Sequence, residues 1–432
     1  MNEQKMNLVL KICGVFLCLY LFLIGISGLS KSISGLTSPE NLTKNDMVQV
    51  KEISIVDAND KPVTKKKVWV KIIKVNDDES YTYEFTEDKH TYTSTINDKD
   101  IKKSASSTFL KAVNSSFICL FIGVFATVLF QSSSTTTSLI VGMAGGGLIE
   151  LNSAIPMVMG ANIGTTVTNT LISLGHLRKG EEFKRAFAAS TVHDFFNILA
   201  VIIFFPIEYF FGFLEKGATS LGNMFFTEIS EKPFQSPIKQ AVSWGVDHLK
   251  HLVHTVSESN WLLLIVSVVV TLIMLFSIVK LLRSMVLSKV EAFFDKYIFK
   301  TALRAMIFGF GLTVLVQSSS ITTSVIVPLA GAGVLSLRQI FPFTLGANIG
   351  TTITSLMAAL VLNPLAMVVA FSHLLFNILG IVLIYPIEAI RNIPLKCAET
   401  ISELAVKNKF IPVLYLAIVF VLIPLTIILL GG

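Results

Sequence analysis

Long apolar runs dominate the chain and predict helices that cross a membrane. About 20 apolar residues are needed to span the hydrocarbon core of a bilayer. The runs that approach this length are Leu8–Leu29, Ala186–Phe211, Trp261–Leu282, Met367–Ile384 and Ile411–Leu430. The first run is too long for a signal peptide and lacks a small-residue cleavage site, so we expect it to be retained. The pattern predicts an all-α polytopic membrane protein.

Residues 31–108 interrupt this pattern, because apolar and polar positions alternate there. Segments such as MVQVKEISIV and KKVWVKIIKV favour strands, and AND, NDDES and INDKD supply turns between them. We expect a small β-rich extramembrane insertion of roughly three to five strands. Its many charged residues are typical of a solvated surface, and a partner-binding or gating role is the alternative to a purely structural one.

Two polar motifs lie within the apolar sequence, and each occurs twice at the same offset of 186 residues. QSSSTTT at 131–137 returns as QSSSITT at 317–323, and GANIGTT at 160–166 returns at 346–352. The apolar run before each QSSS is too short to span a bilayer, which favours a re-entrant helical hairpin with QSSS at its tip. Two glycines in each GANIGTT favour a broken helix.

The basic residues predict the topology. LRKGEEFKR at 177–185 should be cytoplasmic, and the amphipathic stretch 280–304 is typical of a cytoplasmic interfacial helix. Counting spans places the N-terminus inside, residues 31–108 outside, and the two hairpins in opposite orientations, as in inverted-topology repeats. The domains expected are a first helix (1–30), the insertion (31–108), transport repeat 1 (109–212), an outer loop (213–260), transport repeat 2 (261–390) and a C-terminal segment with the last helix (391–432).

The hairpin tips combine hydroxyl groups with the unpaired N–H groups of helix N-termini, and this combination suits an oxyanion. The serines concerned are Ser132, Ser133, Ser134, Ser318, Ser319 and Ser320, with Thr135 beside them. Neutral carbonyl oxygens suit Na⁺, and the candidates are Gln131, Gln317, Asn162 and Asn348. The alternative for such residues is ordinary helix packing, but duplication of the paired motifs favours a composite site.

Other polar residues have two interpretations. His193 and His373 share a repeat position, where helix packing and proton sensing are both open. Asp194 has no symmetric partner, because Leu374 takes its place, so a functional role and a helix-end ion pair both stay open. We interpret Glu208 and Glu388 as interfacial caps.

Composition narrows the function class. Hydrophobic residues make up 52% of the chain and charged residues 15%, with a net charge of +6. No aromatic and basic module for nucleic acid accompanies that charge, no catalytic motif is present, and no Cys/His spacing suggests a transition metal. We therefore expect neither an enzyme nor a cofactor-dependent protein, and no ATP-binding domain is present, so an ion gradient or a partner would supply energy.

At this point the motifs resemble the type II sodium-dependent phosphate cotransporters, including their bacterial members. The matching strings include QSSSTTTSLIVGMAGGG, PMVMGANIGTTVTNTL, EFKRAFAASTVHDFFN, VQSSSITTSVIVPLAGAGVLSL and SHLLFNILGIVLIYPIE. The resemblance implies symport of Na⁺ and inorganic phosphate, with the six serines at the phosphate site. The sodium ligands that it implies are Gln131, Gln317, Asn162, Asn348 and Asn197, with Thr165 and Thr351 as further candidates.

The chain departs from that family after its first GANIGTT. Animal members carry QAGD after GANIGTT, whereas the aligned string here is HLRK, with Lys179 in place of the acid. Sodium stoichiometry and electrogenicity therefore stay open, as does the formation of a homo-oligomer. We expect a plasma-membrane symporter that works by alternating access of the elevator type. A transporter of another small oxyanion, such as sulfate or arsenate, and a membrane receptor with a vestigial transport core are the alternatives.

Overall fold

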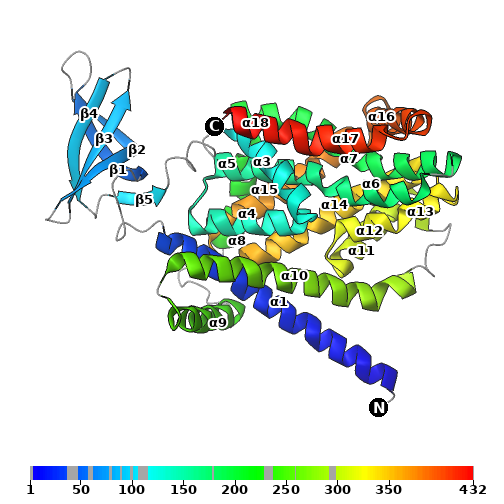
Figure 1. Ribbon diagram of the computed structural model, residues 1–432, viewed down its shortest axis with the longest axis horizontal. Coiled ribbons are helices and arrows are strands. Elements are labelled where there is room, and N and C mark those ends of the chain that lie inside the picture. The colour runs from blue at the N-terminus through cyan, green and yellow to red at the C-terminus, as the bar shows by residue number, and fades with distance from the viewer. Residues whose placement is uncertain are drawn as a thin grey trace.

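The alternating and the apolar parts of the sequence form separate structures (Figure 1). The computed structural model describes residues 3–36, 47–56, 62–76, 80–87, 90–97, 101–105, 115–177, 180–227, 237–257, 259–290 and 298–431. Within these ranges, strands form one sheet and helices form a bundle beside it. The prediction of a helical membrane protein with a small β-rich insertion is confirmed.

The sheet has five antiparallel strands in the order β4-β3-β2-β1-β5. They are β1 (Met47–Val56), β2 (Pro62–Val75), β3 (Ser80–Glu87), β4 (His90–Asn97) and β5 (Ile101–Ala105). Val48 lies opposite Val70 in the register. Side chains at alternate positions share one face of a strand, and the buried ones are Val48, Val50, Val70, Ile72, Tyr81, Tyr83 and Ile96. The sheet therefore has a small apolar core of its own.

Six helices among the described residues are long and apolar enough to cross a membrane. They are α1 (Glu3–Leu36), α7 (Glu181–Phe211), α10 (Asn260–Val290), α14 (Leu337–Leu360), α15 (Pro364–Ile384) and a last span made of α17 (Ile411–Tyr415), a π-helix (Leu416–Leu422) and α18 (Ile423–Gly431). All five predicted apolar runs lie in these helices. Helix α14 is a sixth candidate span that the apolar runs did not predict. The chain is a multi-pass membrane protein.

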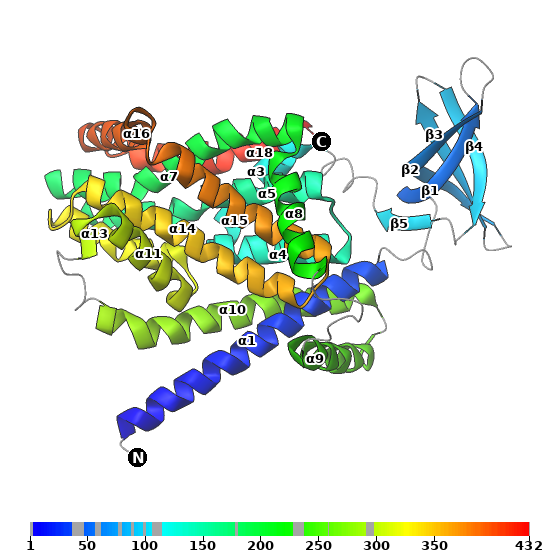
Figure 2. The same ribbon diagram turned by 180° about the vertical axis from the view of Figure 1, so that it is seen from behind.

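Two helical hairpins carry the QSSS motifs. The first consists of α3 (Ser116–Phe130) and α4 (Ser133–Gly146), and the second of α11 (Ala302–Val316), α12 (Ser319–Ser324) and α13 (Ile326–Gly331). Each first arm has 15 residues, or about 22 Å of helix, which is short of a hydrocarbon core of about 30 Å. Figures 1 and 2 show α3 on the sheet side of the bundle and α11 toward the far side, as opposite insertion requires.

The broken-helix prediction holds in only one repeat. In the first, α5 (Leu151–Ile163) is followed by a 3₁₀ turn (Gly164–Thr166), α6 (Val167–Ser173) and a second 3₁₀ turn (Leu174–His176). In the second repeat the prediction is wrong, because α14 is continuous through its GANIGTT. A Cβ at Gly346 would lie 1.9 Å from the carbonyl oxygen of Met306 on α11. The glycine therefore permits close packing of two helices without a break.

One loop prediction needs correction. The stretch 280–304 does not form a separate interfacial helix in the described residues, because α10 extends to Val290 and α11 begins at Ala302. The expected outer loop contains the helices α8 (Phe213–Thr227) and α9 (Pro237–His254). Glu208 is a cap as predicted, since its carboxylate accepts the N–H groups of Leu214 and Glu215 at the start of α8.

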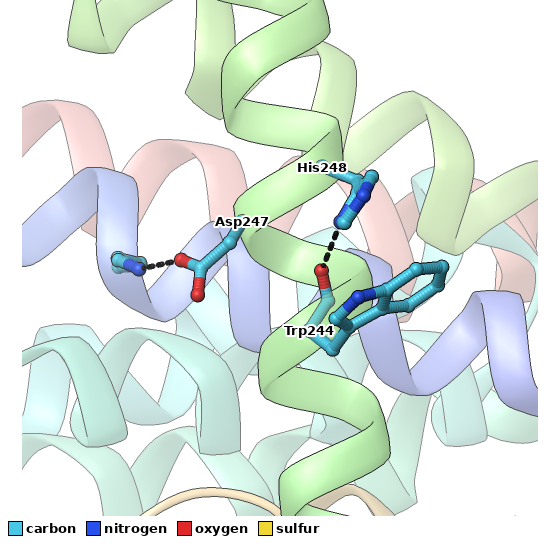
Figure 3. A network of polar contacts seen from close by, with 4 residues as sticks. Trp244, Asp247 and His248 are labelled. Atoms are coloured by element: carbon cyan, nitrogen blue, oxygen red, sulfur yellow. Dashed lines mark hydrogen bonds and ion pairs between the residues drawn. The ribbon is translucent and has the colours of Figure 1, made fainter.

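Helix α9 is held against α1 by polar contacts. The ammonium of Lys31 lies 2.5 Å from the Asp247 carboxylate, and the hydroxyl of Tyr20 donates to the carbonyl of Ala241. Figure 3 shows Asp247 facing this contact, while His248 lies over Trp244 with its Nδ1 at 2.8 Å from the Trp244 carbonyl oxygen. In Figure 1, α9 is seen end-on beside the lengthwise α1 and α10, so its axis runs across theirs. The remaining helix, α16 (Glu388–Lys407), packs on α7.

Candidate functional site

Each hairpin tip begins with a glutamine in the left-handed conformation. Gln131 has φ 53° and Gln317 has φ 55°, and no other non-glycine residue in the described part of the chain has a positive φ. Such a backbone costs an L-residue roughly 1–2 kcal/mol. Each side chain compensates by donating its amide N–H to a carbonyl of the helix that it ends, Val128 or Val314, at 2.7 Å.

The glutamine oxygens tie each tip to the second motif of the same repeat. Thr168 donates its hydroxyl to Gln131 Oε1 at 3.0 Å, and Thr354 donates to Gln317 Oε1 at 2.8 Å. Both threonines lie just beyond GANIGTT. A carbonyl oxygen keeps a second lone pair when one is used, so each glutamine can still coordinate a cation. Their assignment to sodium stays a prediction.

The next residue of each motif starts a helix. Ser132 and Ser318 are N-caps, and their hydroxyl oxygens accept the N–H groups of Thr135 and Ile321 at 3.2 and 3.3 Å. The first N–H groups of a helix have no partner within it and carry its positive dipole end. Ser133, Ser134, Ser319 and Ser320 occupy these first positions, and all four are buried.

Threonines behind the serines strengthen the same helices. Thr136 and Thr322 donate to the carbonyls of Ser132 and Ser318, each at 3.0 Å. Thr137 and Thr323 repeat this pattern one residue later. The protons of these hydroxyls are therefore used within the helix. Thr135, predicted to aid phosphate binding, is also buried.

Each hairpin's second arm contacts the opposite repeat. Ser320 of hairpin two donates to the carbonyl of Thr165 at 3.2 Å. Thr323 accepts a hydrogen bond from Asn169 of α6 at 2.6 Å. In hairpin one, α4 packs on α14 and α15. Among the described residues, no hydrogen bond joins the two serine clusters directly. Each second arm instead contacts helices or turns of the opposite repeat.

A buried chain of asparagines and histidines connects the repeats behind the tips. Asn162 donates to Asn377 Oδ1 at 2.8 Å, and His373 Nε2 lies 3.0 Å from Asn162 Oδ1. In the symmetric arm, Asn348 donates to Asn197 Oδ1 at 2.8 Å, and His193 Nε2 lies beside Asn348 Oδ1. The motif asparagine of each repeat is thus held by the HxxxN helix of the other.

One further bond joins the two arms, because Asn197 donates to the backbone carbonyl of Asn162 at 2.8 Å. These bonds fix the histidine tautomers. Each asparagine N–H group is used in donation, so its oxygen faces the ring and Nε2 must carry the proton. His373 Nδ1 lies 3.3 Å from the Ser355 hydroxyl oxygen, whose own proton goes to the Thr352 carbonyl at 2.8 Å, and His193 Nδ1 has no hydrogen-bond partner among the described residues. Helix packing and proton sensing therefore stay the two interpretations of these histidines.

The remaining predicted sodium ligands are threonines of the two GANIGTT motifs. The hydroxyls of Thr165 and Thr351 donate to the carbonyls of Ala161 and Ala347, at 3.2 and 3.1 Å. Their lone pairs stay free for a cation. The donor set is neutral oxygen throughout, which suits Na⁺. Within the described ranges, no group of three or more His, Cys, Asp or Glu side chains is placed to hold a metal ion.

Two features were not assigned from the sequence. Asn169 donates a hydrogen bond to Thr323 of the second hairpin. In the sequence it is only one polar residue within VTNTL, and the repeat gives no further signal, because the equivalent residue is Ser355. Asp194 is buried and accepts the hydroxyl of Tyr415 at 3.0 Å, so its partner is the last span rather than a helix-end cation. Lys179, which replaces the acid of the animal members, lies outside the described residues.

Comparisons with known proteins agree with these motifs. The profile of a family described as Na⁺/Pi-cotransporter matches residues 94–227 and 277–386. The chain is 34% identical to sodium-dependent phosphate transport protein 2A of Rattus norvegicus over 379 residues, which cover 71% of this chain and 59% of the rat protein. It is also 34% identical to protein 2B of Homo sapiens over 399 residues, or 71% of this chain and 58% of the human protein. The chain thus spans less than two thirds of these relatives' length, and no solved structure matches it.

Proposed function

Because this chain belongs to the Na⁺/Pi-cotransporter family, we propose that it carries inorganic phosphate across the membrane together with Na⁺. The observation that carries the proposal is the pair of hairpin tips, each with a left-handed glutamine, a serine N-cap and buried serines at a helix N-terminus. Relatives that are named sodium-dependent phosphate transport proteins support the choice of substrate and coupling ion.

Phosphate would bind between the tips. Hydroxyls of Ser132, Ser133 and Ser134 would donate from one side and those of Ser318 and Ser319 from the other. Ser320 would join them once its hydrogen bond to the Thr165 carbonyl is released. Helix N-termini favour an anion through their free N–H groups and dipole, so no buried cationic side chain is needed. Sodium ions at the glutamine and asparagine oxygens would offset the charge of phosphate, which lowers the cost of burying it.

The two tips differ in environment, as alternating access requires. Gln131 is exposed, whereas Gln317 is only 9% exposed. In an inverted repeat, each tip is related to the opposite side of the membrane. The difference lies at the glutamines, since Ser133, Ser134, Ser319 and Ser320 are buried at both tips. We infer that transport exchanges these environments by an elevator-type movement of the repeats in the plasma membrane, with the N-terminus inside and residues 31–108 outside.

The function is tested by uptake of radiolabelled phosphate into proteoliposomes with an inward Na⁺ gradient. We expect uptake with Na⁺ and none when K⁺ replaces it; equal uptake in both would refute Na⁺ coupling. Unlabelled sulfate and arsenate at matched concentrations test the alternative oxyanions. Stronger competition by either anion than by phosphate would reassign the substrate.

The site is tested by a double variant and a matched control. Ser133→Ala with Ser319→Ala should abolish uptake while folded protein is retained, because both serines lie at the helix N-termini. Ser138→Ala with Ser324→Ala removes one hydroxyl from the second arm of each hairpin, at the same repeat offset but away from the tips, and should transport normally. Near-normal uptake by the first pair would remove these serines from the site.

A further inference from the structure

An apolar cavity lies behind the first hairpin tip, away from the polar site. It has a volume of about 510 Å³ and lies between hairpin one and the α1–α10 pair. Its wall includes Leu29 and Ile33 of α1, Ile122 and Phe130 of α3, and Trp261 and Val268 of α10. The hydroxyl of Thr136 is already bonded to the Ser132 carbonyl, so the wall offers almost nothing to a polar ligand.

The position of the cavity indicates which apolar ligand it takes. Its α1 and α10 walls belong to two membrane spans, Met6–Ile33 and Asn260–Leu282. Leu36 and Trp261 lie where these two spans end on the sheet side, and Trp261 is 64% exposed. A tryptophan at a span end is typical of the membrane–water interface. We therefore expect the cavity to begin at the level of the lipid headgroups and to open toward the hydrocarbon region of the membrane.

The length of the cavity matches one leaflet. Along α10 it extends from Trp261 to Val268, about 10 Å at 1.5 Å per residue, and along α3 from Phe130 to Ile122, about 12 Å. Half of a hydrocarbon core is about 15 Å. The inner end is Phe130, the residue before Gln131 at the tip. A chain that enters from the interface would thus reach almost to mid-membrane.

The packing around the cavity explains why it is open. Beside it, α4 approaches α1 closely through glycines, where a Cβ at Gly142 would lie 2.9 Å from Leu29 and a Cβ at Gly146 would lie 2.8 Å from Ile33. Helix α10 contributes Leu264 and Val268 from the other side. Helices α1 and α4 are close together at these glycines, and the larger side chains beside them hold the helices apart. The space between them is therefore not filled by side chains. Apolar space of this size is unfavourable unless atoms occupy it.

We propose that this cavity binds one acyl chain of a phospholipid from the leaflet on the sheet side, between hairpin one and the α1–α10 pair. The bound chain packs against Phe130 and Thr136, and none of the tip serines belongs to the wall. The lipid is therefore a structural ligand of the hairpin. This site is independent of which ion the protein transports.

Photolabelling in vesicles tests the assignment directly. The purified full-length chain is placed in phosphatidylcholine vesicles that contain phosphatidylcholine with a diazirine in its acyl chain, without Na⁺ or phosphate. After irradiation, mass spectrometry of peptides should locate label on α3, α4 and the first half of α10. Labelling spread evenly over all exposed apolar helices would overturn the proposal.

A cavity-filling pair makes the test specific. Val268→Phe places a ring in the cavity, whereas Val269→Phe, one residue along, is 45% exposed and outside the wall. Each excluded methylene weakens binding by about fourfold, so two excluded methylenes predict a loss of roughly 15-fold in cavity labelling. The Val269→Phe protein should be labelled like the wild type.

A second filling variant controls for misfolding of the first. Ala126→Phe fills the cavity from α3, with Leu129→Phe, at a 65% exposed position, as its control. Both filling variants should lose label while they elute as monodisperse protein. Unchanged labelling in both would refute the site. Labelling by a diazirine fatty acid but not by the phospholipid would refute the choice of lipid. None of these outcomes depends on phosphate uptake, so they do not bear on the proposed function.

Discussion

The bond between His193 and Asn348 is predicted to couple the two repeats energetically. Asn348→Leu keeps the side-chain size but removes both of its buried hydrogen bonds, one to Asn197 and one to His193. His193 and Asn197 are both 0% exposed, so water cannot replace the lost partner. An unpaired buried group costs about 1–3 kcal/mol, although bonds between membrane helices average only about 0.6 kcal/mol with a maximum near 1.7. We therefore expect Asn348→Leu to destabilise the protein by about 1–3 kcal/mol.

A double-mutant cycle isolates the pair. His193→Phe, Asn348→Leu and their combination are unfolded reversibly in mixed detergent micelles, and the free energies of unfolding are compared. We expect a coupling energy of about 0.6–1.7 kcal/mol, because the double variant loses the shared bond only once. Thr354→Val with His193→Phe is the control cycle, since Thr354 donates to Gln317 rather than to the histidine.

Additive effects of the two variants would show that this bond does not couple the repeats. Independent sites add within about 0.3–0.5 kcal/mol. If His193→Phe and Asn348→Leu add within that limit, the bond contributes nothing across the repeats. If the Thr354 control cycle shows the same coupling as the test cycle, the effect is a general loosening of the core, and the assigned hydrogen bond does not explain it.

Three further predictions concern other parts of the site. Gly346→Ala should abolish folded protein, because its Cβ would lie 1.9 Å from the Met306 carbonyl oxygen. The control Gly311→Ala, which has open space around its Cβ, should fold. The monodisperse fraction in size-exclusion chromatography measures the folding of both variants. Tyr415→Phe removes the described partner of Asp194 and should lower stability by about 1–3 kcal/mol, while Tyr209→Phe, at a 61% exposed position, should not. Gln317→Gly should stay folded, since glycine adopts a positive φ readily, yet lose Na⁺-dependent uptake. Retained uptake would remove the Gln317 side chain from the proposed sodium site.

The hairpins and their tips were accessible from the sequence for a physical reason. A run that is too short to span a bilayer and ends in polar residues has few stable placements in a membrane. The repeat then identified equivalent residues, such as Asn162 and Asn348. It could not show that each asparagine bonds the histidine of the opposite repeat, because a sequence repeat records correspondence and not contact.

The error in α14 has a different origin. Both GANIGTT copies read as helix breakers, because glycine favours turns and broken helices. The same residue also lets two backbones approach, and both copies are used in this way: a Cβ at Gly160 or Gly346 would collide with the α3 or α11 backbone. Only the first copy departs from α-helical geometry as well. The pattern does not distinguish the two uses, because both require the absence of a side chain.

The contacts also bear on how the proposed elevator would move. Glycines hold the first arm of each hairpin close to its own repeat, because Gly160 of α5 packs on α3 and Gly346 of α14 packs on α11. Polar bonds lock hairpin two and the motif helices to the other repeat, through Ser320 and Asn348. Sliding one hairpin alone would break bonds that water cannot replace inside a membrane. Helix α1 instead meets α4 through the apolar side chains of Leu29 and Ile33 and directs its Lys31 to α9. Because the hairpins and the motif helices are bonded across the two repeats, we expect the proposed movement to carry them together, relative to the α1–α10 pair and to the acyl chain proposed above.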